Sequence, residues 1–228
     1  MAMVQDTHGG HGHGHGDEPL HHQFEDIHQQ NETYVIGMWT FLVTEVMFFG
    51  ALFLAYSLYR WKYQPDFYIA HKELSVFFGG LNTVVLLISS FFMAKAVYHA
   101  QRKEKRKQLN MLWLVQACAV AFLFIKVVFE WMPKWQHHLT PLNFIWDKPE
   151  GNAEHAQLFF SLYFGMTGLH GIHILAGIIV IGALQYLVWK DAPSVKGDYI
   201  PTEMIGLYWH FVDIVWIFLF PLYYLLPR

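Results

Sequence analysis

The chain has 228 residues, of which 54% are hydrophobic, 18% are aromatic and only 14% are charged. Soluble globular chains carry about 25% charged residues, so this composition excludes an ordinary soluble enzyme. The net charge of −3 argues against a nucleic-acid-binding surface, and the single cysteine, Cys118, excludes an intrachain disulfide and a cysteine-based metal centre.

The first 33 residues form a polar segment with seven histidines, many glycines and no lysine or arginine. We expect residues 1–33 to be a flexible, disordered, His-rich cytoplasmic tail, because this composition buries too little apolar surface to fold. His11, His13 and His15 alternate with glycines and offer a weak chelating site for a divalent metal ion. A solvated tail is the simpler interpretation, and the sequence predicts no other metal site.

Five apolar blocks follow the tail. A helix needs about 20 apolar residues to cross the hydrocarbon core of a bilayer, and the third block reaches this length if Lys126 extends outward to the interface. A soluble helical bundle would show polar helix faces, which these blocks lack. The sequence therefore predicts an all-α integral membrane protein, a bundle of five transmembrane helices within residues 34–228. The predicted helices cover residues 34–60, 74–98, 109–132, 155–190 and 203–226.

Positive charge between the second and third helices sets the predicted orientation. Six basic residues lie there: Lys95, Arg102, Lys103, Lys105, Arg106 and Lys107. Loops rich in lysine and arginine stay in the cytoplasm. Helix parity then predicts a cytoplasmic N-terminus and a C-terminus on the periplasmic, outer side.

Ionisable side chains are rare inside the predicted spans. Placing one in the membrane costs free energy, so each one that occurs there is a candidate for a functional or structural role. They are Glu45, His170, His173, His210 and Asp213. The histidines could supply axial ligands to a haem, or Glu45, His173 and Asp213 could form a proton or ion path. Alternatively, these groups satisfy one another and fix helix packing, as His210 and Asp213 could at a spacing of three residues.

Other polar and small residues favour packing roles. Asn82 and Thr83 can bridge helices by hydrogen bonds. Lys126 and Glu130, spaced i,i+4, are expected to neutralise each other near the outer interface. Glycines in the fourth helix let another helix approach closely. They are Gly165, Gly168, Gly171 and Gly177.

Five short motifs occur in order along the chain. Residues 44–49 read TEVMFF, residues 81–83 read LNT, and residues 130–131 read EW. Residues 167–173 read TGLHGIH, and residues 208–216 read YWHFVDIVW. In this order the motifs resemble those of the cytochrome c oxidase subunit III family of the haem–copper oxidases. The chain is most similar to the five-helix bacterial form, which lacks the first two helices of seven-helix members.

The resemblance implies a non-redox subunit III of a proton-pumping terminal oxidase in an aerobic respiratory chain of a bacterial inner membrane. Such a subunit stabilises subunit I and supports its proton uptake and the access of lipid and oxygen. Haem and copper would lie on partner subunits I and II, so no cofactor is expected on this chain. Membrane lipids, bound phospholipid and a respiratory supercomplex are further expected partners, and nucleic acid is not.

The resemblance assigns no catalytic residue, and it places a buried functional or structural polar set within the spans. The set is Glu45, Asn82, Glu130, Thr167, His170, His173, His210 and Asp213. Family members carry a basic residue near the end of the penultimate helix, and the nearest candidate for this contact with lipid phosphate is Lys190. Trp39 and Trp209 are further candidate lipid contacts.

Alternatives from other classes stay open. The same subunit could belong to a quinol oxidase, since electron donors dock on other subunits, or to the related subunit associated with nitric oxide reductases. An independent proton channel built on Glu45 is a third alternative.

Overall fold

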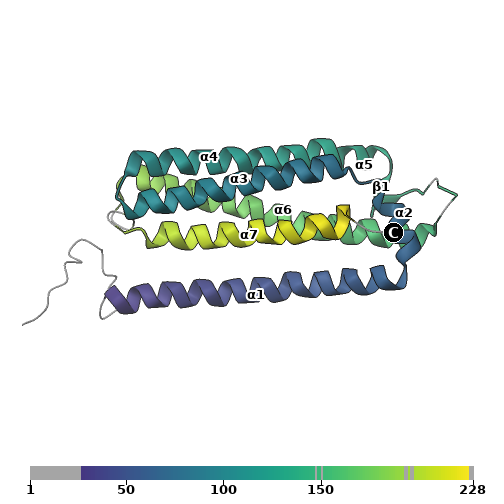
Figure 1. Cartoon of the computed structure of the whole chain (residues 1–228), viewed down its shortest axis with the longest axis horizontal. Helices are drawn as coiled ribbons and strands as arrows, with labels where there is room; N and C mark the ends of the chain where they lie inside the picture. The colour runs from purple at the N-terminus through teal and green to yellow at the C-terminus, as the bar shows by residue number, and fades with distance from the viewer. Residues whose placement is uncertain (1–26, 147, 150, 193–194, 196–197, 226–228) are drawn as a thin grey trace, which may run out of the picture.

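The computed structural model describes residues 27–225, except 147, 150, 193–194 and 196–197. Among these residues, five helices are long and apolar enough to cross a membrane, which confirms the predicted all-α membrane fold. The five long helices run side by side (Figure 1). The elements in chain order are α1 (Ile27–Lys62), α2 (Gln64–His71), α3 (Val76–Gln101), α4 (Lys105–Ile125), the π-helix η1 (Lys126–Trp131), α5 (Met132–Gln136), β1 (Leu139–Thr140), β2 (Asn143–Phe144), α6 (Ala153–Trp189) and α7 (Ile200–Tyr224).

Four of the long helices form the compact part of the bundle. Helix α3 packs against α4 and α7, and α6 packs against the same two helices. Helix α1 lies along one side, against α7 and α6 (Figure 1). Aromatic side chains fill the interior, because large rings bury much apolar area with few rotatable bonds. Those fully buried include Trp209, Trp216, Tyr56, Tyr163, Tyr223 and Tyr224.

The two ends of the bundle differ in structure. The hairpin end carries α2, α5 and an antiparallel pair of two-residue strands, β1 and β2. There, His155 Nδ1 lies 2.5 Å from Asp66 Oδ2, and Asp66 Oδ1 accepts a hydrogen bond from the backbone of Asn152, so α2 is fixed against the start of α6. The basic end holds the start of α1, the turn between α3 and α4, and the connection from α6 to α7.

The predicted N-terminal tail was too long. Helix α1 begins at Ile27, so residues 27–33 are helical, and Gln30 is buried. Glutamine and glutamate are good helix formers, and polarity alone does not mark a segment as unfolded. The remaining predicted tail, with His11, His13 and His15, lies outside the described residues.

Candidate functional site

A carboxylate and a histidine meet between α1 and α6. His173 Nε2 lies 3.0 Å from Glu45 Oε2, and His173 Nδ1 lies 2.8 Å from the carbonyl oxygen of Leu169. A carbonyl oxygen only accepts, so Nδ1 carries a hydrogen, and the contact between Nε2 and the carboxylate then holds one further proton. The pair is a charged His–Glu pair or its neutral counterpart. It reaches the surface of the chain, since the two side chains are 17% and 19% exposed.

A second cluster lies toward the hairpin end, where η1 faces α6 and α7. Lys126 and Glu130 form an ion pair, and Lys126 Nζ also lies 3.0 Å from Tyr163 OH and 2.6 Å from Tyr224 OH. Both tyrosine hydroxyls donate hydrogen bonds to Glu130 Oε2, the Tyr163 bond measuring 2.8 Å. Lys134 Nζ donates to the Glu130 carbonyl oxygen at 3.1 Å. One carboxylate is therefore held by an ammonium group and two phenols.

The structure corrects one part of the sequence prediction for this pair. The two residues neutralise each other and Glu130 is buried, as expected. Lys126, however, does not extend outward to the interface, because the Lys126 and Glu130 side chains are only 3% and 0% exposed. The Trp216 ring, 4.8 Å from Lys126 Nζ, adds a cation–π contact. The wide π-helical turn of η1, a form that often marks functional sites, carries both residues.

Hydrogen bonds join α3 to α7 at three levels. Trp216 Nε1 donates to Thr83 Oγ1 at 3.1 Å, and Trp209 Nε1 donates to Ser89 Oγ at 3.0 Å. Next to the second of these bonds, the hydroxyl of Ser90 lies 2.6 Å from His210 Nδ1.

The hydrogen bonds between α3 and α7 show that the expected pairing of His210 with Asp213 is wrong. His210 bonds Ser90 instead, because α3 packs closely enough to present that hydroxyl. The buried Asp213 carboxylate makes no hydrogen bond to His210 and lies next to the side chain of Ser90 instead.

Three further residues of the predicted polar set make no bond between helices. His170 is fully buried between the rings of Phe122 and Trp216, and neither ring nitrogen has a hydrogen-bond partner among the described residues. The amide of Asn82, expected to bridge helices, also has none there. Thr167 donates within its own helix to the carbonyl of Tyr163 at 2.6 Å.

The candidate lipid contacts differ in exposure. Trp39 is exposed, and the exposed Lys190 lies at the basic end with its Nζ 4.7 Å from the Tyr186 ring. Trp209 is 0% exposed and fills the space left by Gly177, where an added Cβ would come within 2.6 Å of its ring. Its ring offers no surface to lipid, so that expectation is corrected.

Sequence reasoning missed the phenols and hydroxyls that complete these contacts. Tyr163 lies four residues before Thr167 and seven before His170, so helical spacing puts it on the same face of α6. This spacing was an available signal for Tyr163. Ser90 and Tyr224 gave no comparable signal, because serine and tyrosine are ordinary residues of membrane helices.

Five membrane-spanning helices packed around internal ion pairs and hydrogen bonds define a multi-pass membrane protein with a polar interior. Within the described residues, no three His, Cys, Asp or Glu side chains gather closely enough to hold a metal ion.

Comparison with known proteins gives the family. The sequence model of the family described as Cytochrome c oxidase subunit III matches residues 150–227. The chain is 31% identical over 196 residues to a probable quinol oxidase subunit 3 of Staphylococcus saprophyticus subsp. saprophyticus, covering 84% of this chain and 88% of that protein. It is 28% identical over 207 residues to a cytochrome c oxidase subunit 3 of Thermostichus vulcanus, covering 90% and 92%.

A third relative is a cytochrome bo(3) ubiquinol oxidase subunit 3 of Pseudomonas putida, 29% identical over 205 residues, with 87% and 88% covered. The chain therefore belongs to the subunit III family of the haem–copper oxidases, as the motifs indicated. It is a terminal oxidase subunit III of the respiratory chain.

Proposed function

We propose that this chain is the non-redox subunit III of a bacterial inner-membrane complex that reduces oxygen to water and couples this reaction to proton translocation. Haem and copper are then carried by partner subunits I and II. The proposal is supported by the engagement of the interior histidines in packing. His173 contacts Glu45 and a backbone carbonyl, His210 contacts Ser90, and aromatic rings enclose His170.

Absorption spectra test the proposal. An axial ligand needs an imidazole nitrogen that faces an open haem plane. We expect the isolated full chain to bind no stoichiometric haem, whereas the whole oxidase shows haem bands under the same conditions. One haem per isolated chain would contradict the non-redox assignment.

Within the complex, we propose that the subunit stabilises subunit I and supports its proton uptake. The pair of Glu45 and His173 supports this role, because its geometry requires one proton between two side chains near the surface of the chain. An independent proton channel is the second candidate. The full chain in liposomes distinguishes them: we expect no proton flux, and flux that disappears in Glu45→Gln would favour the channel.

The electron donor of the complex is proposed to be cytochrome c, with quinol as the alternative. The relatives include subunits of both kinds of oxidase. Typing the haems and detecting the copper pair of subunit II in the purified complex decides between them. Identifying the chains that co-purify also tests for subunits I and II and for a respiratory supercomplex.

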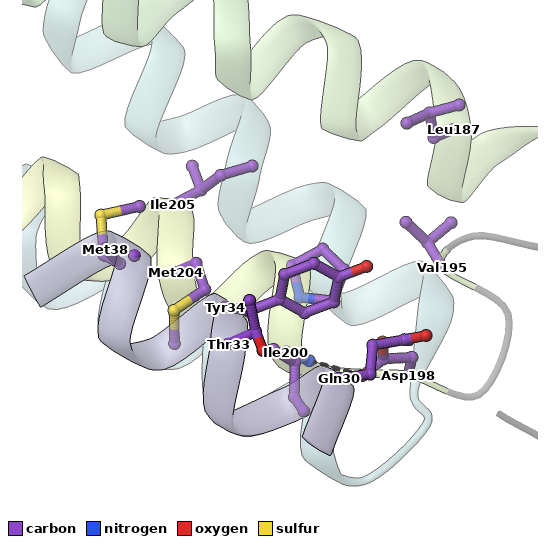
Figure 2. Close-up of a pocket in the computed structure, with 12 residues that line it drawn as sticks. Gln30, Thr33, Tyr34, Met38, Leu187, Val195, Asp198, Ile200, Met204 and Ile205 are labelled. Carbon is purple, nitrogen blue, oxygen red and sulfur yellow. Dashed lines mark hydrogen bonds between the residues drawn. The ribbon is translucent and has the colours of Figure 1, made fainter. Parts of the chain in front are cut away.

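A bound phospholipid is proposed for the cavity beside α1. This cavity, of about 500 Å³, opens between the start of α1 and the basic ends of α6 and α7. Figure 2 shows Met38, Met204 and Ile205 along it, with Asp198 and Gln30 at one end. Its mainly apolar lining fits an acyl chain. Gly37→Leu would fill it and is expected to remove one lipid per complex, whereas Gly50→Leu, on an exposed turn away from the cavity, keeps that lipid.

We propose a cytoplasmic N-terminus on the basis of the positive charge at the basic end. A cysteine placed at Lys103 in a Cys118→Ala background is expected to resist a membrane-impermeant thiol reagent in spheroplasts. A cysteine at Leu142, on the hairpin end, is expected to react. The reverse labelling pattern would invert the topology.

A further inference from the structure

A groove of about 540 Å³ opens between the start of α1 and the start of α7, at the basic end of the bundle. Its apolar lining includes Val35 and Ile36, which are 37% and 65% exposed. None of the α1 residues that line it belongs to the cavity proposed for a phospholipid, so the two openings lie on different faces of α1. Helix α1 is also the least buried of the five long helices, so most of its surface is available for contacts outside the chain.

The polar groups that line this groove are mainly acceptors. Glu32 of α1 and Glu203 of α7 bring two carboxylates. Asn31 lines the groove too, and its Oδ1 is buried without a hydrogen-bond partner among the described residues. A buried acceptor without a donor is costly, and an ionised carboxylate can only accept. These groups therefore point to a donor that carries positive charge and comes from outside the chain.

The chain supplies little positive charge here itself. No described lysine or arginine lines the groove, and none precedes Arg60 in the sequence. Arg60 lies in the last turn of α1, at the opposite end of that helix. Helix α1 thus lacks the basic residues that usually flank a helix on the cytoplasmic side.

Other carboxylates at this end of the bundle already have cationic partners within the chain. Asp191 Oδ2 lies 2.6 Å from Lys105 Nζ, and Glu104 Oε1 lies 3.2 Å from Lys107 Nζ. Both ion pairs involve the turn between α3 and α4 or the residues that follow it, away from the groove.

A protein helix fits this groove better than an anionic lipid does. Phosphate and ester oxygens accept hydrogen bonds, and two carboxylates repel an anionic headgroup. The cytoplasmic ends of transmembrane helices carry lysine and arginine, whose stems lie along apolar surface while their charged heads reach polar partners. We propose that the groove docks the cytoplasmic end of a transmembrane helix of another oxidase subunit, whose lysine or arginine contacts Glu203 and Asn31 Oδ1. This rests on the proposed function, namely membership of an oxidase complex with a cytoplasmic N-terminus.

Rebinding of the full chain to oxidase depleted of this subunit measures the docking. An exposed ion pair contributes up to about fivefold in affinity, so Glu203→Gln should weaken rebinding about fivefold. Glu203→Lys also adds a like-charge repulsion of similar size, so it should weaken rebinding about twenty-five-fold. The control Asp191→Asn removes the same charge from the same end outside the groove, and should stay within about twofold. Equal losses in Glu203→Gln and Asp191→Asn, or wild-type affinity in Glu203→Lys, would overturn the charge contact.

A photo-cross-linking residue at Ile36 identifies the occupant in the intact oxidase. We expect an adduct with another subunit, close to a lysine or arginine at the end of one of its transmembrane helices. The same probe at Leu142, which is fully exposed at the hairpin end, should not label that segment. Adducts with phospholipid alone, with a second copy of this chain or with a helix end that has no cation would overturn the proposal. Because Ile36 is exposed, this test holds even if Glu203→Lys fails to fold.

The docking surface and the proposed function fail in different ways. If no other oxidase subunit co-purifies with the wild-type chain, the proposed function fails. If those subunits co-purify but the adduct of the Ile36 probe lies on none of them, only the docking surface is overturned.

Discussion

At the scale of single residues, Glu130 gives the clearest energetic expectation. It is fully buried, and its carboxylate neutralises Lys126 while accepting bonds from two phenols. Glu130→Gln removes the negative charge and leaves a buried ammonium group, which typically costs about 3–5 kcal/mol. We expect this loss in the thermal or detergent unfolding of the full chain.

The matched control removes both charges. Lys126→Met combined with Glu130→Met removes both charges of the ion pair and keeps the side-chain volume, so it should recover most of the lost stability. If the single and double variants were equally unstable, the tyrosine contacts would carry the stability instead of the ion pair.

We expect the protein to tolerate loss of the Glu45 charge better than loss of the Glu130 charge. Glu45→Gln keeps the side-chain shape, and its amide can donate to the free Nε2 of a neutral His173. We expect the variant to co-purify with the oxidase at wild-type yield. Glu45→Leu leaves the ring nitrogen unpaired and should cost about 1–3 kcal/mol. Failure of the Gln variant to assemble would make Glu45 a structural anchor.

At the scale of elements, the contact of α6 with α7 depends on one glycine. A Cβ at Gly177 would meet the Trp209 ring at 2.6 Å, whereas a Cβ at Gly168 of the same helix meets nothing within 4 Å. Gly177→Ala should therefore destabilise the chain by about 1–3 kcal/mol through overpacking. Gly168→Ala, the control, should be neutral or stabilising, as alanine favours helix. Thermal unfolding of the two variants measures the difference.

The turn between α3 and α4 should depend on pH. The hydrogen bond from His99, at 2.7 Å, and then that from Lys107 hold the pKa of the Glu104 carboxyl below its ordinary value of 4.5. A lowered folded-state pKa contributes stability that is fully present above pH 4.5 and is lost as the pH falls through the folded-state pKa. Amide protection at residues 102–104 should therefore fall in acid.

Glu104→Gln supplies the control for that turn. The amide has no proton to gain in this range, so protection at residues 102–104 should be independent of acid pH in the variant. A variant that kept the wild-type pH profile would assign the change to another group.

Helices as elements were predictable, whereas their local deviations were not. Span length depends on composition over about 20 neighbouring residues, which the sequence displays directly. The π-turn at Lys126–Trp131 carries Lys126, whose partners Tyr163 and Tyr224 lie on two later helices. The sequence of residues 126–131 contains no information about where these two tyrosines lie.

At the scale of the whole molecule, the residues of the candidate site could be predicted from the sequence, whereas their contacts could not. Burying an ionisable side chain in lipid costs free energy, and for that reason the sequence identified Glu45 and His173 as candidates. Their contact, however, joins positions that are 128 residues apart in the sequence. The expected pair of His210 and Asp213 was wrong because a helix from elsewhere in the chain supplied a better partner, Ser90. The spacing of residues along one helix predicts which of them share a face of that helix. It does not predict which residues of other helices lie opposite that face.

The distance along the chain between Glu45 and His173 also has a consequence for synthesis. Helix α1 is made first, and its partner on α6 emerges 128 residues later. At about 5–20 residues per second, Glu45 spends roughly 6 to 26 s without that partner. During this interval the nascent first helix must hold a solitary acid within the membrane, protonated or shielded by the insertion machinery. The pair that the finished bundle holds can therefore form only after α1, α3, α4 and the first half of α6 have been synthesised.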